Sequence, residues 1–326
     1  MKAYIYDVEE NSLAPHRHVS KIKEFGLFDK SLNVNSLHKR PLPRLFLTLL
    51  CLQNYRTYMA HIVLVRYSIT LLPILLFRSI IRRKTVIEFN GSLSQDLLDR
   101  QRGAFVSTIT KYMLKFTRPY AVYLVSHNLK EEFRILFPHA NIVVLENGVD
   151  KVPISAVSRS TSKTIRFAYV GSLAYREGVD TAMEFLTLVN FPFELHYFGN
   201  EAIEETAMSI GFKGRIVTHF YEDYSVLIRE LSNCDLAVHF RRNASIGDSQ
   251  GIPFKTLDYI NAGLPIIASD ISFYTALSNS YPVVFSLDEL DNISFMKDMA
   301  LKCKETVLKD YDWDNVKTGL NILIND

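Results

Sequence analysis

The segment Gln250–Ser269, with the sequence QGIPFKTLDYINAGLPIIAS, contains the start and the end of a helix and the strand that follows it. Pro253 suits the first turn of a helix, and Gly263 suits the left-handed position that ends one. Pro265 prevents the helix from continuing, and the apolar run Ile266–Ala268 predicts a buried strand. We therefore expect a helix, a tight turn and a strand in succession, as in α/β proteins.

Lys255 and Asp258 are three positions apart in this predicted helix, so they share one of its faces within the first two turns. A cation and a carboxylate placed there could hold a diphosphate and ribose hydroxyls, respectively. A surface ion pair has the same spacing. The spacing of Lys255 and Asp258 alone does not distinguish these two interpretations.

Short β-branched and aromatic runs recur on both sides of this segment, separated by stretches of helical length. The predicted strands are Lys2–Tyr6, His61–Arg66, Val86–Phe89, Ala121–Val125, Ile142–Leu145, Arg166–Val170, Glu194–Phe198, Arg215–Val217, Asp235–Phe240 and Ile266–Ala268. Near-continuous apolar strands alternating with helices indicate parallel sheets covered on both faces. We expect an α/β fold of two Rossmann-like, doubly wound domains, with about five strands each, facing a central cleft.

The domain boundary is predicted at the Ser/Thr-rich run Ser155–Thr164, which has few large apolar residues and is typical of a linker. A chain of 326 residues is long enough for two domains. We expect an N-terminal domain over 1–150, a C-terminal domain over 151–310, and a final helix over 311–326.

The composition is that of a globular protein, with 48% hydrophobic and 22% charged residues. Cys51, Cys234 and Cys303 have neither metal-ligand nor redox spacing, which favours reduced thiols in a cytoplasmic protein. No signal peptide is expected at the N-terminus. The apolar runs Leu45–Leu52 and Tyr67–Phe77 are too short to span a membrane.

The net charge of +2 conceals a strong asymmetry between the two halves. Residues 1–165 carry 24 Lys and Arg against 12 Asp and Glu, a formal charge of +12, whereas residues 166–326 have a formal charge of −10. Such asymmetry favours an anionic partner for the first half. Basic side chains spread over a solvated face would give the same count.

A second candidate site is Tyr169–Asp180, where a strand ends at Gly171 and a helix begins near Gly178. Glycine allows a ligand to approach the backbone closely, and the helix N-terminus offers free N–H groups to a phosphate. Arg176 could add a charge-assisted contact. A strand, a glycine loop and a helix are also common in α/β proteins that bind no phosphate.

The segment from Pro253 to Ser269 closely resembles the donor-binding segment of GT-B glycosyltransferases, particularly glycosyltransferase family 4. The resemblance extends in order along the chain. Similar segments are Val65–Ser68 and Glu88–Gly91 in the predicted acceptor domain, Glu146–Asp150 at the domain junction, Tyr169–Asp180 before the phosphate-binding helix, and Tyr311–Trp313 before a final helix that packs back toward the first domain.

The resemblance implies that the C-terminal domain binds a nucleotide-diphosphate sugar and that the N-terminal domain binds the acceptor. The implied donor-binding residues are Gly171, Ser172, Arg176, Arg241, Gln250, Lys255 and Asp258. This chain departs from the family where Gln250 and Asp258 replace two glutamates, and where Ser172 and Glu177 replace basic residues. Arg176 and Lys255, with Arg241 or Arg242, would then neutralise the diphosphate.

In the N-terminal domain, His16, Arg17 and His18 replace the glycine-rich turn of the family and are candidates for binding an acceptor or a phosphate. Histidines near a helix start are often only polar caps. Glu88 and Asn90 face the same side of one strand and are candidate catalytic residues. The role expected for Asn90 is a hydrogen bond to a sugar. His127 is a further candidate, although a buried structural histidine is the alternative.

The resemblance therefore implies a retaining transferase, and we expect it to need no metal and no cofactor besides its nucleotide-sugar donor. We expect a glycan or lipid-linked oligosaccharide acceptor, cytoplasmic location with peripheral contact to the anionic inner face of a membrane, and no nucleic-acid partner. The lipid contact is assigned to the apolar runs flanked by Arg44, Arg78, Arg82, Arg83 and Lys84. The alternatives are a sugar-nucleotide epimerase of the same fold and a catalytically silent partner subunit.

Overall fold

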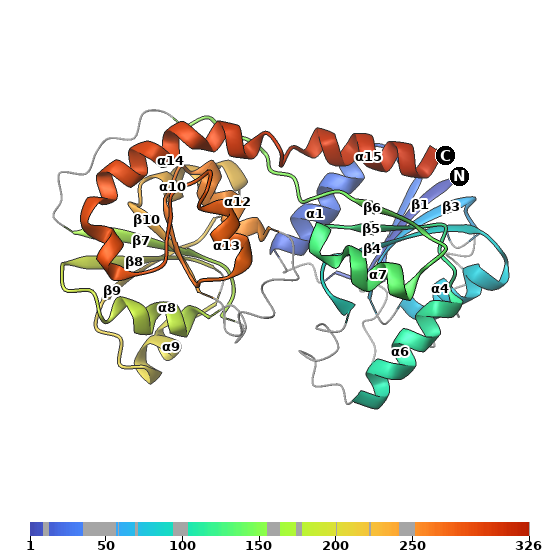
Figure 1. The fold of residues 1–326 in the computed structure, drawn as a ribbon, viewed down its shortest axis with the longest axis horizontal. Helices are drawn as coiled ribbons and strands as arrows, with labels where there is room; N and C mark the ends of the chain where they lie inside the picture. The colour runs from blue at the N-terminus through green and yellow to red at the C-terminus, as the bar shows by residue number, and fades with distance from the viewer. Residues whose placement is uncertain are drawn as a thin grey trace. The chain divides into compact units, whose positions relative to one another are not determined.

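The computed structural model describes residues 1–8, 13–34, 57, 59–68, 71–93, 104–154, 164–173, 178–199, 201–221, 223–240 and 252–325. These residues form two compact units, of which one comprises Met1–Gly148 and Trp313–Asp326 and the other comprises Val149–Asp248 and Ile252–Asp312. Each unit is built around a six-stranded sheet whose paired strands are all parallel. Figure 1 shows the elements of both units.

The first unit has the strand order β2-β1-β3-β4-β5-β6. Its strands are β1 (Lys2–Tyr6), β2 (Lys30–Asn33), β3 (Ile62–Arg66), β4 (Lys84–Phe89), β5 (Ala121–Leu124) and β6 (Asn141–Val144). Its helices are α1 (Leu13–Glu24), α4 (Leu72–Ile80), α6 (Ala104–Phe116), α7 (Lys130–Leu136) and α15 (Trp313–Asn325), with a 3-10 turn η4 (His127–Leu129).

Both faces of this sheet are covered by helices, as the alternation along β4 shows. Glu88 faces α1, where its carboxylate lies 3.0 Å from the Nε2 atom of His18. The next residue, Phe89, faces the opposite side and packs on Phe133 of α7 with 4.3 Å between ring centroids. Trp313 at the start of α15 packs edge-on against the His18 ring, so α15 covers the same face as α1. The predicted doubly wound arrangement is confirmed for this unit.

The second unit has the strand order β12-β11-β10-β7-β8-β9. Its strands are β7 (Ile165–Val170), β8 (Phe193–Phe198), β9 (Arg215–His219), β10 (Leu236–His239), β11 (Ile266–Ala268) and β12 (Val283–Val284). Its helices are α8 (Val179–Leu186), α9 (Glu204–Ser209), α10 (Tyr224–Ser232), α12 (Phe254–Asn261), α13 (Ser272–Leu277) and α14 (Ile293–Leu308), with a 3-10 segment η6 (Leu287–Asn292).

Alternate residues of β7 belong to two separate cores, because successive side chains of a strand point to opposite faces. Phe167 and Tyr169 pack with the apolar residues of α8 and α9. Ala168 and Val170 pack instead with α10, α12, α13 and α14. Figure 1 shows these two groups of helices on opposite sides of the sheet. This sheet is therefore doubly wound as well.

The expectation of about five strands per half is wrong by one strand in each unit. β2 reads Lys-Ser-Leu-Asn, a polar edge strand with no apolar run to reveal it. β12 contains only two residues and is an edge strand of the second sheet. Edge strands are short and polar more often than central ones, so the hydrophobic pattern identifies them poorly.

The assignment of Arg78 to a lipid-facing surface is also wrong. Its side chain is fully buried. The guanidinium donates to the Thr85 hydroxyl over 2.9 Å, to the Ala60 carbonyl over 3.1 Å and to the Lys84 carbonyl over 2.5 Å. A buried charge is kept when its N–H groups find acceptors, and here they join α4 to the start of β4. No helix in the described part of the chain is both long and apolar enough to cross a membrane.

Candidate active site

The strand order of the second unit reverses between β7 and β10, because one half of the sheet grows outward from each of them. In open parallel sheets, ligands bind beyond the carboxyl ends of the strands at this reversal, which is called the switch point of the sheet. β7 ends at Val170 and β10 ends at His239. The loop after Val170 and the helices that begin near it are therefore where a ligand of this unit is expected.

Gly171 and Lys255 meet at this point. Gly171 follows β7 with a φ of +137°, a backbone conformation that residues with a side chain rarely adopt. A Cβ atom on Gly171 would lie only 3.0 Å from the Nζ atom of Lys255. The same ammonium lies 4.9 Å from the centroid of the Tyr169 ring. The structure therefore holds a cation against a bare backbone at the switch point, which is a setting suited to a phosphate.

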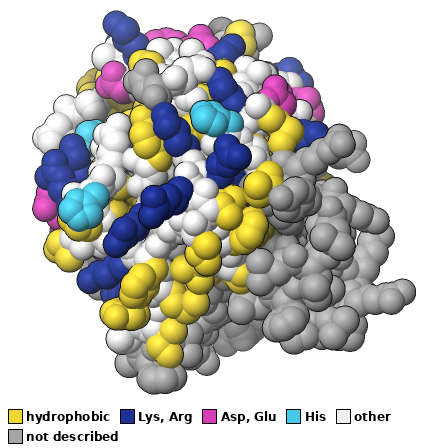
Figure 2. All heavy atoms as spheres, turned by 90° about the vertical axis from the view of Figure 1, so that its right-hand side faces the viewer, with side chains coloured by type: hydrophobic (Ala, Val, Ile, Leu, Met, Phe, Trp, Pro, Cys, Tyr) yellow, Lys and Arg dark blue, Asp and Glu magenta, His cyan; other side chains and the backbone are white. Residues whose placement is uncertain are grey.

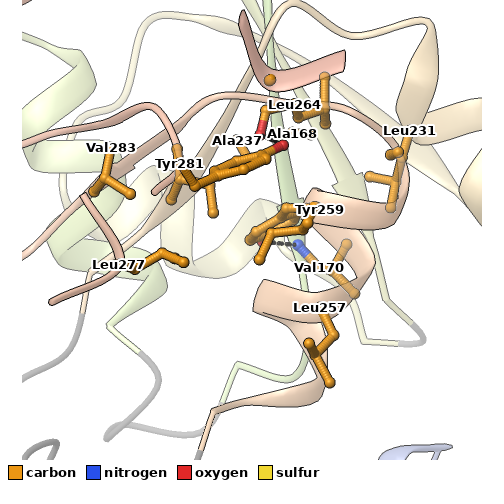
Figure 3. Close-up of a cluster of buried hydrophobic side chains, with 14 of the residues drawn as sticks. Ala168, Val170, Leu231, Ala237, Leu257, Tyr259, Leu264, Leu277, Tyr281 and Val283 are labelled. Atoms are coloured by element: carbon orange, nitrogen blue, oxygen red, sulfur yellow. Dashed lines mark hydrogen bonds between the residues drawn. The ribbon is translucent and has the colours of Figure 1, made fainter. Parts of the chain in front are cut away.

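Helix α12 is fixed to the sheet by Tyr259, as Figure 3 shows. The Tyr259 hydroxyl accepts a hydrogen bond from the Val170 N–H over 2.9 Å and donates to the Val238 carbonyl over 3.4 Å. A buried second network joins Thr256 to Tyr274 over 2.8 Å, and Tyr274 to the Nδ1 atom of His239. The helix that carries Lys255 is thus held rigidly against β7 and β10.

Asp258, expected to face ribose hydroxyls, is buried and already hydrogen-bonded. Its Oδ1 atom accepts from the Tyr224 hydroxyl over 2.9 Å. Asn261 donates from Nδ2 to the same Tyr224 hydroxyl over 3.2 Å and to the Asp150 carbonyl over 2.8 Å. Tyr224 therefore orients the carboxylate. Sequence reasoning missed Tyr224, because nothing near α12 indicates a partner 34 positions earlier.

Helix α8 follows β7 along the chain, and its apolar face is buried. Gly178 precedes it as the cap residue with a φ of +65°, and Val179, Ala182, Met183 and Leu186 are buried as their spacing predicts. Ser172 is exposed in the loop between β7 and α8. Three further predicted donor-binding residues, Arg176, Arg241 and Gln250, lie outside the described residues. The prediction that Pro253 lies in the first helical turn is off by one residue, because Pro253 is the residue that caps α12.

In the first unit, the buried Glu88 is the centre of a polar cluster made of side chains from α1, from three strands and from the residue that follows β4. Its Oε1 atom accepts from Nη1 of Arg66 over 2.8 Å and from Nδ2 of Asn90 over 2.8 Å. The Nε2 atom of His18 lies 3.0 Å from the same oxygen. The Tyr4 hydroxyl donates to Oε2 over 3.2 Å. We call these five residues the Glu88 cluster.

The electrostatics of the Glu88 cluster favour a charged carboxylate. Burial by itself raises the pKa of Glu88, but Arg66 and His18 outweigh this effect and lower it to about 2. Burial also lowers the pKa of His18, against the opposing attraction of Glu88. Burial and the Glu88 charge both raise the pKa of Tyr4. At neutral pH the cluster therefore contains one carboxylate, one guanidinium and a neutral imidazole.

The other candidates of the first unit lie at the same sheet edge with different exposure. Asn90 is exposed, and the hydrogen bond to Glu88 fixes its side chain. His127 begins the 3-10 turn after β5 and is exposed, so the alternative of a buried structural histidine is wrong. Arg17 is half-buried on α1. His16 lies in α1, but its side chain is outside the described residues.

Within the described part of the chain, no group of three or more His, Cys, Asp or Glu side chains is placed to hold a metal ion. Lys255 and the N-terminus of α8 provide positive potential in the second unit. In the first unit, the exposed amide of Asn90, which donates a hydrogen bond to Glu88, provides a hydrogen-bonding group in a fixed position.

No protein-family model matches the chain, and no curated protein matches its sequence. Solved structures, in contrast, match over the full chain. Sucrose-phosphate synthase from Thermosynechococcus elongatus is 12% identical, with 100% of this chain and 98% of that chain covered and a TM-score of 0.73. Anabaena HepE in complex with UDP-glucose is 12% identical over 100% and 99%, with a TM-score of 0.72.

The lipopolysaccharide outer core galactosyltransferase WaaB in its apo form is 14% identical, with 98% and 99% of the two chains covered and a TM-score of 0.62. The chain has the GT-B fold. Full coverage with identities this low means that the GT-B fold is shared, whereas most side chains are not. The predicted fold class is confirmed.

Proposed function

We propose that this protein is a glycosyltransferase that takes a sugar from a nucleotide-diphosphate donor bound in the second unit. The observation that carries the proposal is the Lys255 ammonium held against Gly171 at the switch point of the sheet. The fold similarity to HepE, whose structures are complexes with UDP, with UDP and glucose, and with UDP-glucose, supports a uridine nucleotide as the first donor to test.

The proposed chemistry breaks the bond between the anomeric carbon and the β-phosphate oxygen and forms a bond from that carbon to an acceptor hydroxyl oxygen, whose proton passes to the departing diphosphate. The departing diphosphate gains negative charge. Lys255 and the free N–H groups of α8 would stabilise that charge as it develops, and preorganised groups of this kind supply a large part of the rate enhancement in many enzymes. Asp258, oriented by Tyr224, would bind ribose hydroxyls.

We further propose, from the family resemblance, a retaining transfer without a metal ion or other cofactor, onto a glycan or lipid-linked oligosaccharide of a cell-surface polysaccharide. The strongly basic first half supports a lipid-linked acceptor at an anionic inner membrane face. Asn90, held by Glu88, is the group of the first unit proposed to bind an acceptor sugar. Arg17 is a further acceptor or phosphate candidate.

The test is a donor screen in which nucleotide release is detected by mass spectrometry, with lipid-linked oligosaccharides as acceptors and with EDTA in a parallel arm. We expect release of the nucleotide diphosphate and a glycosylated product in both arms. Lys255→Ala should lower kcat/KM at least tenfold, since a hydrogen bond to a charged group contributes about 1.5 to 3 kcal/mol. Nucleotide binding without turnover of any donor would contradict transfer and would fit a silent subunit.

A further inference from the structure

Helix α6 exposes an apolar stripe to solvent. Its inner side is buried at Thr110 and Leu114, and Thr117 directly after the helix is buried too, which fixes the orientation of the helix on the first unit. On the outer side, apolar residues recur at spacings of three and four, and their exposed fractions are 41% for Ile109, 63% for Tyr112 and 54% for Phe116. The Tyr112 and Phe116 rings contact each other edge to face at 5.0 Å. One continuous strip thus points away from the core.

The end of α4 extends this strip. The Ser79 hydroxyl donates to the Phe116 carbonyl over 2.8 Å, so the last turn of α4 lies beside the last turn of α6. Ile80 follows directly and is 79% exposed, more than any other large apolar side chain in the described residues. Arg82 and Arg83 come next in the turn before β4 and are both exposed.

Basic side chains surround the strip, and exposed acidic side chains are missing from these segments. Lys115 on α6 is exposed beside Tyr112 and Phe116. In residues 71–93 and 104–120, the one carboxylate is Glu88, which is fully buried. Figure 2 shows Lys and Arg side chains beside a band of hydrophobic side chains on this side of the molecule. The exposed charge of these two described segments is therefore entirely positive.

We propose that this surface, formed by Ile80, Arg82, Arg83, Ile109, Tyr112, Lys115 and Phe116 and called here the α6 surface, docks onto an anionic lipid membrane. The aromatic and apolar side chains would enter the interface while the basic ones contact lipid phosphates. Tyrosine suits this position because its ring is apolar and its hydroxyl is polar. The proposal rests on the proposed function and deepens it, because it identifies the surface by which an enzyme that acts on a lipid-linked acceptor would bind the membrane.

A second copy of the chain fits the α6 surface poorly. Two identical faces would bring Arg82, Arg83 and Lys115 against their own counterparts without a carboxylate to neutralise them. Like charges placed together at an interface are unfavourable. An anionic lipid surface supplies the missing negative charge together with an apolar layer.

The experiment is co-sedimentation of the full chain with phosphatidylcholine vesicles, with and without phosphatidylglycerol, in the absence of nucleotide. We expect binding to the anionic vesicles only, weakened by salt. The triple variant Arg82→Glu, Arg83→Glu, Lys115→Glu should bind at least about a hundredfold more weakly, since each basic residue near an anionic surface contributes a factor of about five. The double variant Tyr112→Ser, Phe116→Ser should lose binding as well.

Matched control variants test whether vesicle binding depends on the residues of the α6 surface or only on the number of exposed basic and apolar side chains. Lys213→Glu and Lys309→Glu remove exposed lysines of the second unit, and Ile135→Ser removes an exposed apolar residue of α7 in the first unit. All three controls should bind as wild type does. Circular dichroism checks that each variant is folded. Absence of wild-type binding to anionic vesicles, as expected if an acidic protein were the partner, would overturn the proposal, and so would unchanged binding of both α6 variants.

A second readout places the contact on α6 directly. Tyr112→Trp adds an indole to the stripe, and its emission should shift to the blue when phosphatidylglycerol vesicles are added. Ile135→Trp should show no shift, and an equal shift in both variants would overturn the assignment to α6. These measurements need neither donor nor turnover, so their failure and a failure of nucleotide binding are distinguishable.

Discussion

Replacing Glu88 with glutamine would remove the negative charge from the Glu88 cluster while keeping the volume of the side chain. Glu88 is fully buried, and Arg66 and His18 lie within 2.8 and 3.0 Å of one of its oxygens. Removing one partner of a buried ion pair leaves the other charge uncompensated, at a cost of about 3 to 5 kcal/mol. We expect the free energy of unfolding of the first unit to fall by that amount.

The acid side of the stability curve gives an independent value for the same carboxylate. Its folded pKa is lowered to about 2, and in the unfolded chain it is about 4.3, a difference equivalent to about 3 kcal/mol at neutral pH. Because the folded pKa is the lower one, this stability is present above about pH 4.3 and is lost as the pH falls toward 2. His18, whose folded pKa is also lowered, binds its proton preferentially in the unfolded chain, so it reduces stability once the pH falls below about 6.5.

The assay is urea unfolding followed by tryptophan fluorescence, because the single tryptophan reports on this unit. Trp313 lies 5.6 Å from the His18 ring and 6.2 Å from the Phe25 ring, between centroids. With a typical slope of about 2 kcal/mol per molar urea, the midpoint of Glu88→Gln should fall by about 2 M. Glu131→Gln breaks an exposed ion pair with Arg134 and should change the midpoint very little. An unchanged midpoint in Glu88→Gln, with an unchanged acid transition, would refute the reasoning.

Three further predictions concern the second unit. Tyr224→Phe removes the hydrogen bond that orients Asp258, so calorimetry should show the Kd for UDP raised about fivefold and the Kd for inorganic pyrophosphate, which lacks the ribose, unchanged. Equal effects on the two ligands would contradict a role of Asp258 in binding the ribose. Tyr259→Phe leaves the Val170 N–H buried without its acceptor and should cost about 1 to 3 kcal/mol, measured by circular dichroism during urea unfolding; a neutral result would contradict its anchoring role. Gly263→Ala places a side chain at a φ of +68° against Leu301 and should cost about 1 to 2 kcal/mol, detected as a lowered Tm; an unchanged Tm would contradict the strain argument.

Most of the fold could be predicted because the central strands are continuous apolar runs. The ranges Lys2–Tyr6 and Ile266–Ala268 were predicted with their observed bounds, and the other central strands differ by at most two residues at an end. The turn at Gly263 was predictable from the need for a left-handed residue after a helix, and it has the expected positive φ. The edge strands β2 and β12 carry no such signal, whereas the other two edge strands, β6 and β9, do.

The candidate sites were predictable only as far as neighbours in sequence determine them. Glu88 and Asn90 are two residues apart and do meet, as alternation along a strand requires. Arg66 reaches Glu88 because Arg66, the last residue of β3, is paired in register with Glu88 of β4, which a sequence read without strand pairing does not show. His18 comes from α1, far along the chain. Arg78 was misplaced because a basic flank of an apolar run looks the same whether its guanidinium faces solvent or backbone carbonyls.

Calorimetric titration of the protein with UDP, repeated with GDP, tests the central claim most directly, because it isolates the donor site from the acceptor and from catalysis. We predict that the wild type binds UDP, that Lys255→Ala weakens binding at least about tenfold, and that Lys213→Ala, which removes an exposed lysine of the same unit, binds as wild type. Absence of binding to either nucleotide, or wild-type affinity in Lys255→Ala, would contradict the assignment of a nucleotide-sugar site to Gly171 and Lys255.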